Sequence, residues 1–222
     1  MTLVTFLALG LLLVVVMLGR RNSKTTACSA VFDTKEDLQA SLRQYTLRPS
    51  TKKTELLGVA NEWCFPNVED FSDLFSLDAG LQQFNYDIGD WDVSAVTNMS
   101  QMFSGSRFNQ DIGRWDVSSV TDMTRMFANT DTFNQNIGYW NVSSVTNMDG
   151  IFRKAKSFNQ DIGGWDVSSV ASMIDMFSGA TSFHQNLCGW TKGKTELLIR
   201  KARCRFRFSS FCFSLLKMIA RC

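Results

Sequence analysis

Apolar side chains recur along the middle of the chain with a period of about 25 residues. Five segments share a Phe, an Ile or Leu four residues later, and a Trp three residues after that. A sixth, degenerate copy begins at Trp63, which has apolar side chains at the same offsets as Trp91. Self-similarity at a fixed period predicts stacked units, each too small to bury its apolar faces alone. We therefore predict a repeat region over residues 63–190, with one degenerate unit and about five more. Its predicted structural core consists of Trp63, Trp91, Trp115, Trp140, Trp165, Trp190, Phe84, Phe108, Phe133, Phe158, Phe183, Ile88, Ile112, Ile137 and Ile162.

The order of apolar and polar positions predicts a short helix in each unit. In the fullest unit, Ser118 precedes Val120, Met123 and Met126 at the spacing of one face of an amphipathic helix. Ser118 or Asp116 is the expected N-cap. The residues expected to end the helices in a left-handed conformation are Gly105, Asn129 and Gly179.

A second apolar segment in each unit, such as Phe108 to Trp115, predicts a short strand or extended ribbon. Gly113 is expected to let the backbone turn there. The unit is therefore predicted to be one ribbon plus one short helix.

Polar side chains repeat in the same register. One column is Asn85, Asn109, Asn134 and Asn159, and another is Asp92, Asp116, Asn141 and Asp166. A calcium ladder would use carboxylates in such columns. We favour side chains that satisfy backbone groups at turns, because Asn replaces Asp in one unit and no glycine-aspartate nonapeptide period occurs.

The N-terminus is strongly apolar. Residues 1–19 carry no charged side chain, would span about 28 Å as a helix, and are followed by Arg20, Arg21 and Lys24. We predict a transmembrane or signal-anchor helix that contacts the membrane through residues 3–18, with a cleaved signal peptide as the alternative. The three basic residues favour a cytosolic body by the positive-inside rule, whereas the body has an extracellular character, so the orientation stays open. Residues 20–31 are the expected linker.

Composition narrows the possible functions. The 222 residues are 45% apolar with a net charge of +2, which predicts a folded core and argues against a nucleic-acid partner. A single His and the absence of a CxxC pair leave few routes to a metal site or a catalytic triad. Gly193-Lys194-Thr195 lacks the earlier glycine of a phosphate loop. We predict no catalytic, cofactor-binding or metal site and no cofactor.

The repeat FNQDIGRWDVSSVTDMTRMF closely resembles the BspA-like leucine-rich-repeat surface proteins, a domain of unknown function found in mycoplasmas, other bacteria and microalgae. The resemblance covers about residues 32–190. It implies an α/β fold: a right-handed leucine-rich-repeat-like solenoid of ~25-residue units, preceded by the hydrophobic helix and a lead-in helix. The segment FDTKEDLQASLRQY (32–45) is similar to that lead-in, with Asp33 and Glu36 at capping-box spacing, so residues 32–62 are the expected lead-in helix and cap.

Residues 191–222 depart from the repeat and carry 9 basic and 1 acidic side chains. Three interpretations stay open: a C-terminal cap, a basic segment on an anionic membrane, and a wrongly translated or misassembled end. Cys188 could pair with a tail cysteine, Cys204, Cys212 or Cys222, if the body is exported. Cys64 and Cys188 lie too many units apart to bridge each other.

Two N-x-S/T sequons make Asn98 and Asn141 possible glycosylation sites, and Asn98 is the better candidate because Asn141 occupies a predicted cap column.

The function expected from these features is recognition or adhesion by a non-enzymatic surface repeat protein, membrane-anchored or secreted, with an unknown protein or glycan ligand. The expected location is the membrane, at the cell surface or in the secretory pathway. Exposed columns between the core positions are the candidate contacts: Arg107, Arg114, Arg125, Arg153, Lys154 and Lys156. The alternatives are an intracellular-facing membrane-anchored scaffold, a purely structural paralogue, and a hydrolase that uses repeat carboxylates.

Overall fold

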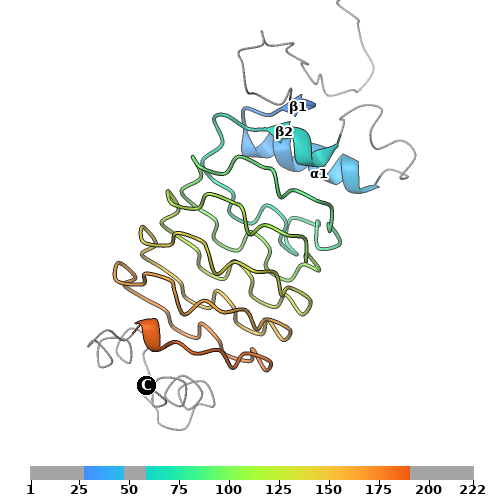
Figure 1. The fold of residues 1–222 in the computed structure, drawn as a ribbon. Helices are drawn as coiled ribbons and strands as arrows, with labels where there is room; N and C mark the ends of the chain where they lie inside the picture. Colours follow the sequence, from blue (N-terminus) through green and yellow to red (C-terminus); the bar gives the residue numbers. More distant parts are fainter. Residues whose placement is uncertain (1–27, 48–58, 191–222) are drawn as a thin grey trace, which may run out of the picture.

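A computed structural model describes residues 28–47 and 59–190 (Figure 1). Its regular elements are β1 (Ala30–Val31), α1 (Lys35–Leu47), the 3-10 helix η2 (Ala60–Glu62), β2 (Trp63–Cys64) and the 3-10 helix η3 (Cys188–Trp190). The predicted leader and tail lie outside these ranges, and β1 falls inside the segment expected to be a linker. Within the described ranges, no helix has the length and apolar character needed to cross a membrane.

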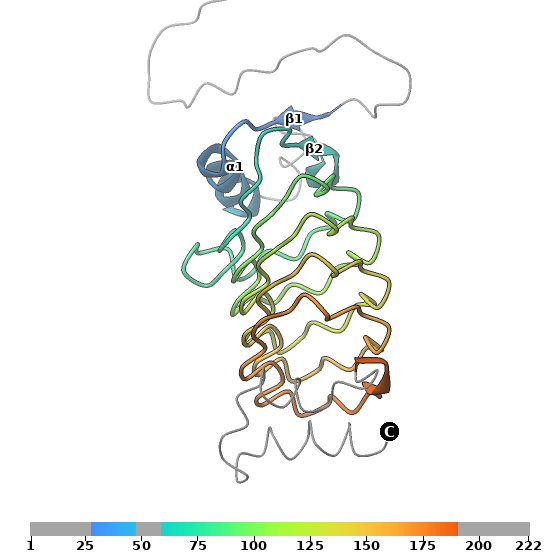
Figure 2. The same cartoon turned by 90° about the vertical axis from the view of Figure 1, so that its left-hand side faces the viewer.

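The repeat units lie in successive layers, as both views show (Figures 1 and 2). One isolated parallel bridge joins each pair of neighbouring layers, in a column through Asp70, Asn98, Asp122, Asn147 and Ser172. Backbone hydrogen bonds join the same layers in both directions: the amide of Met123 donates to Asn147 of the next layer at 3.0 Å, and that of Thr121 to Thr97 of the preceding layer at 2.8 Å. The column spacing of 24 to 28 residues matches the sequence period.

The structure differs from the predicted ribbon-plus-helix unit, because α1 is the one α-helix among the described residues. Residues 118–127 form turns instead. The amides that a helix would use internally are used between layers: Arg125 donates to Asp149 at 2.8 Å and Phe127 to Ile151 at 2.9 Å. An amide that donates to the next layer cannot also donate within a helix, so the hydrogen bonds between layers replace the predicted helix.

Left-handed backbone is present where the sequence predicts it, although it does not end a helix. Gly105, Asn129 and Gly179 have φ values of 70°, 58° and 78°. A second left-handed position lies four residues earlier in each unit, for example Arg125 with a φ of 54°. Two such residues in one turn segment interrupt right-handed helical geometry.

Aromatic rings form the centre of the core. Phe127 stacks on Phe103 and Phe152 of the adjacent layers, with centroids 5.6 and 5.8 Å apart and planes within 5°. It also stacks on Phe133 at 4.0 Å. Every side chain of the predicted structural core is buried, with at most 6% of its surface exposed.

The Trp column adds a polar ladder inside this core. The indole N–H of Trp115 donates to the carbonyl oxygen of Ile88 at 3.0 Å, and that of Trp140 to Ile112 at 3.1 Å. Trp91, Trp165 and Trp190 repeat this bond to the preceding layer. A buried indole N–H needs such a partner, so the bond explains why Trp occupies every layer at this position.

One glycine column allows the layers to approach each other. A Cβ at Gly113 would lie 2.5 Å from the backbone oxygen of Asn136 in the next layer. Gly89 and Gly163 have the same relation to Asp111 and Asn186, at 2.7 and 2.5 Å. The predicted turn is present at residues 113–114. These glycines also leave room for a carbonyl of the neighbouring layer, a role that the sequence alone does not indicate.

We therefore expect Gly113→Ala to lower the free energy of unfolding by about 1–3 kcal/mol, because the added methyl forces two layers apart. Gly164→Ala is the matched control, since a Cβ there meets nothing within 4 Å. Urea denaturation of both variants checks the prediction. Equal stability of the two variants would contradict it.

The lead-in segment covers the first layer. Helix α1 buries Leu38, Leu42 and Tyr45, and the Tyr45 ring meets Trp63 edge-on with centroids 5.4 Å apart. The N-cap of α1 differs from the expected box at Asp33 and Glu36: the amide of Asp37 donates to the Thr34 hydroxyl at 3.2 Å. Asp33 instead accepts a bond from Asn67.

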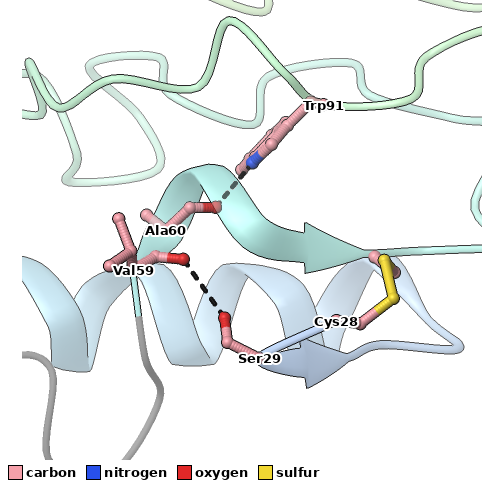
Figure 3. Close-up of a disulfide and its surroundings, with 6 residues drawn as sticks. Cys28, Ser29, Val59, Ala60 and Trp91 are labelled. Atoms are coloured by element: carbon pink, nitrogen blue, oxygen red, sulfur yellow. Dashed lines mark hydrogen bonds between the residues drawn. A yellow bond between two sulfur atoms is a disulfide. The ribbon is translucent and has the colours of Figure 1, made fainter. Parts of the chain in front are cut away.

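A disulfide fixes this lead-in to the repeat region (Figure 3). Cys28 and Cys64 are bonded, with Cα atoms 5.7 Å apart and 36 residues apart in sequence. Strands β1 and β2 pair in parallel beside it, with Val31 opposite Cys64. This pair is not among those expected from the sequence, where Cys64 is considered only against Cys188 at the far end of the repeats.

Candidate recognition surface

Acidic side chains in the repeat columns are held by their own turns. Asp116 accepts the amide of Ser118 at 3.0 Å and its hydroxyl at 2.6 Å. Asp111 accepts the amide of Gly113 at 2.8 Å, and Asp122 that of Thr124 at 2.8 Å. These bonds confirm the interpretation of the Asp columns as turn caps. In the described ranges, no group of three His, Cys, Asp or Glu side chains could hold a metal ion.

The Asn column forms a ladder from layer to layer. The amide of Asn134 donates to Oδ1 of Asn109 at 2.9 Å, and the amide of Asn159 donates to Oδ1 of Asn134 at 2.9 Å. The neighbouring Gln side chains reinforce it, since Gln160 donates to the Asn134 carbonyl at 2.9 Å. These polar groups are therefore occupied by structural bonds.

Two carboxyl groups have shifted pKa values. The hydroxyl and amide of Ser118 lower the pKa of Asp116 below its ordinary value. At Asp70, burial alone would raise the pKa, but bonds from the amide and hydroxyl of Ser72 and from the Lys35 ammonium together lower it. Lys35 Nζ lies 3.2 Å from Asp70 Oδ2. Both groups are therefore favoured as carboxylates.

Because the Asp70 pKa in the folded chain is below its unfolded value, ionised Asp70 stabilises the lead-in above the unfolded pKa of about 4. That contribution is lost as the pH falls through the lowered folded pKa. Asp70→Asn should therefore show a smaller loss of unfolding free energy than the wild type on acidification from about pH 6 to about pH 2. Identical acid profiles would contradict the prediction.

The exposed charges separate into two groups on the repeat region. Seven exposed carboxylates occupy one part of the unit: Asp87, Asp90, Asp92, Asp111, Asp116, Asp161 and Asp166. Arg114 lies among them and pairs with Asp90 at 3.0 Å. Elsewhere in the unit, Lys156 pairs with Asp131 at 2.8 Å. Two of the six predicted basic contacts thus take part in ion pairs across layers.

Three other predicted contacts, Arg125, Arg153 and Lys154, form what we call the basic cluster. A Cβ at Gly150 would lie 3.3 Å from Cγ of Arg125 and 3.6 Å from Cβ of Arg153, so both side chains flank this glycine. Lys154 follows Arg153 directly. Arg125 and Lys154 are exposed and Arg153 is half-buried. No ion pair of the described residues includes these three side chains.

The two sequon asparagines lie in different environments. Asn98 is half-buried in the bridge column between Asp70 and Asp122, whereas Asn141 is exposed. Each accepts an amide through Oδ1, from Ser100 and from Ser143. Exposure therefore favours Asn141 over Asn98 as a glycosylation candidate, the reverse of the order expected from the sequence.

Cys188 lies at the last described layer, in η3, and takes part in a disulfide. Cys204, Cys212 and Cys222 fall outside the described residues, so the pairing of Cys188 with one of them stays a prediction.

Arg107 is the remaining predicted basic contact. Its backbone amide donates to the carbonyl of Gln82 at 2.8 Å.

Comparison with known proteins places the chain in a family without assigning an activity. No curated protein and no solved structure matches it significantly. A family model described as "Mycoplasma protein of unknown function, DUF285" matches residues 26–144 and 106–199. These matches cover most of the 222 residues, including the lead-in and every repeat layer, and this chain belongs to the DUF285 family.

Proposed function

We propose that this chain is a non-enzymatic surface repeat protein, membrane-anchored or secreted, which recognises or adheres to another molecule. Its layers would form a right-handed leucine-rich-repeat-like solenoid of the BspA-like kind. The membership in a family of surface-type repeat sequences supports this proposal, as does the apolar run at residues 3–18.

The observation that carries the proposal is the contrast between constant and variable columns. Core columns repeat the same or a similar apolar residue, as Trp does in each layer, whereas the exposed column of Asp90 continues with Arg114, Tyr139 and Gly164. Tyr139 is 88% exposed. The same hydrogen bonds and packing recur in each layer and form a rigid scaffold. The exposed side chains do not take part in that packing, so they can vary from layer to layer. Solenoids present ligand-binding faces in this way.

The disulfide supports an exported body. A bond between Cys28 and Cys64 persists in an oxidising compartment and is rare in a reducing cytosol. An intracellular-facing scaffold, the alternative, would keep these thiols reduced.

Two observations make the hydrolase alternative less favourable. A general acid at neutral pH needs a raised carboxyl pKa, whereas the pKa values of Asp70 and Asp116 are lowered. The Asp side chains described above are also committed to amides of their own turns.

Proteolytic shaving of intact cells, followed by detection with an antibody to the repeats, tests the proposal. Loss of the repeats from intact cells is the expected result, with a cytosolic marker remaining undigested as the control. Digestion only after lysis would place the repeats inside and overturn it. Mapping of non-reduced peptides provides a second check, because a free Cys64 thiol in the native protein would argue against export.

A further inference from the structure

We propose that the basic cluster of Arg125, Arg153 and Lys154 binds the sulfate or carboxylate groups of a linear anionic polysaccharide. The inference names a ligand class for the proposed recognition function and rests on it for its cellular setting. The binding chemistry itself can be tested on purified protein.

The cluster gathers cationic groups from two adjacent layers. Arg125 belongs to one layer and Arg153 and Lys154 to the next. Gly150 lies between the side-chain stems of Arg125 and Arg153, and the stem of Lys154 lies over Gly179, with Cγ 3.0 Å from a Cβ placed there. The amide of Asn129 donates to the carbonyl of Arg153 at 2.7 Å, which places this exposed Asn beside the cluster. Arg presents a planar fork of donors that fits the oxygens of sulfate or carboxylate groups. The arrangement therefore offers several donors to anionic oxygens within one small area.

Two carboxylates of these layers are committed to other groups, whereas Asp175 is exposed in the layer that follows Gly150. The nearby Asp149 accepts bonds from the hydroxyl of Ser172 and the amide of Ile174, both at 2.6 Å. Asp131 is paired with Lys156. The repeat residues 84–190 have 6 basic and 11 acidic side chains, so three unpaired cations together are a local exception within an acidic region.

Lys154 also occupies a position that disfavours a side chain. Its φ is 57°, and the equivalent left-handed positions in other layers are Gly105, Asn129 and Gly179. Left-handed backbone suits Gly and Asn, and costs a residue such as Lys free energy. Residues retained in strained conformations are concentrated at functional sites. The Lys at this position therefore points to a role for its charge, which Gly cannot supply.

The chemistry around the cluster favours a polysaccharide over a membrane or a nucleic acid. The exposed large apolar side chains of the described residues are Leu47, Val59, Leu77 and Tyr139, and none belongs to the cluster. Membrane surfaces are usually bound through apolar side chains as well as charge, and single-stranded nucleic acids through aromatic stacking.

The test compares binding of dextran sulfate and uncharged dextran to the purified full chain at about 0.15 M salt, with Arg125→Gly/Lys154→Gly as the variant. Gly stands at both equivalent positions in other layers, as Gly150 and Gly179, so the variant keeps a backbone that the fold already accepts. We expect its affinity for dextran sulfate to fall at least about tenfold, because charge-assisted bonds are lost. We expect its Tm to rise by roughly 2–4 °C or more, because left-handed strain is relieved.

Arg114→Gly is the matched control. It removes one positive charge from the acidic part of the unit, where Gly164 stands in the same column, and it should leave the affinity within about twofold of the wild type. An additional single variant, Arg153→Gln, tests the half-buried member without changing the backbone, and it should also weaken binding.

Three results would overturn the proposal. Wild-type protein that fails to bind dextran sulfate would do so directly. Equal affinity in the double variant and the wild type would assign the binding to other basic residues, such as those of 191–222. Tighter binding to anionic vesicles or single-stranded nucleic acid than to the polysaccharide would exclude the proposed ligand class. If the polysaccharide binds but shaving finds the repeats inside the cell, the surface function fails while the anion site stands.

Discussion

Phe127→Ala should lower the free energy of unfolding by about 3–5 kcal/mol, the usual cost of truncating a buried aromatic ring. Phe127 has no exposed surface and stacks on Phe103, Phe133 and Phe152. The variant leaves a cavity shared by three layers, and the backbone bonds between those layers limit how far the cavity can collapse. Urea denaturation followed by Trp fluorescence provides the measurement.

The same substitution at an exposed ring is the control for this prediction. Tyr139→Ala removes an aromatic side chain that is 88% exposed and should change the stability by no more than about 0.5 kcal/mol. Phe127→Leu should lose less stability than Phe127→Ala, because more of the volume is filled. A loss below about 1 kcal/mol for Phe127→Ala would show that the Phe stack is not the centre of the core.

Cys64→Ser should lower the free energy of unfolding by about 2–5 kcal/mol under oxidising conditions. The disulfide closes a loop across a 36-residue separation, so its loss gives the unfolded chain more freedom. It also releases β1 and α1 from the first layer, where they cover Trp63. We expect faster hydrogen exchange in residues 35–47 and 60–64 as the local sign of this release.

Reduction separates the cross-link from the side-chain change. Adding a reductant should lower the stability of the wild type at least to that of Cys64→Ser, because it also opens the disulfide of Cys188. Cys28→Ser/Cys64→Ser should be no less stable than the single variant. Insensitivity of the wild type to reductant, with both cysteines shown to be bonded beforehand, would contradict the assigned role of the disulfide.

The aromatic core and the lead-in disulfide differ in how well they can be predicted from the sequence. The aromatic columns can be predicted from spacing, because side chains that repeat every 24 to 25 residues meet their equivalents when units stack. The lead-in disulfide cannot, since Cys28 lies before the repeats and no period relates it to Cys64. Only the pairing of β1 with β2 brings the two cysteines together.

The candidate site shows the same division. The sequence predicts six basic residues as contacts, and it contains nothing that distinguishes one of them from another. The structure pairs Arg114 with Asp90 and Lys156 with Asp131, and it brings Arg125 beside Arg153 around Gly150. Ion pairing depends on the distances between layers, which an individual sequence does not state.

The sequence by itself determined the repeat length, the buried columns and the side chains that cap turns, because each follows from the order and spacing of residues in the repeats. The tertiary structure decided which backbone groups bond to which. Residues 118–127 have the apolar spacing of a helix, yet the amides of Met123, Arg125 and Phe127 bond to the next layer. Gly113 lies in a turn, as the sequence predicts, but the carbonyl of Asn136 that approaches it comes from a neighbouring layer. A propensity describes a segment alone, whereas the partner of a hydrogen bond depends on what lies beside that segment after folding.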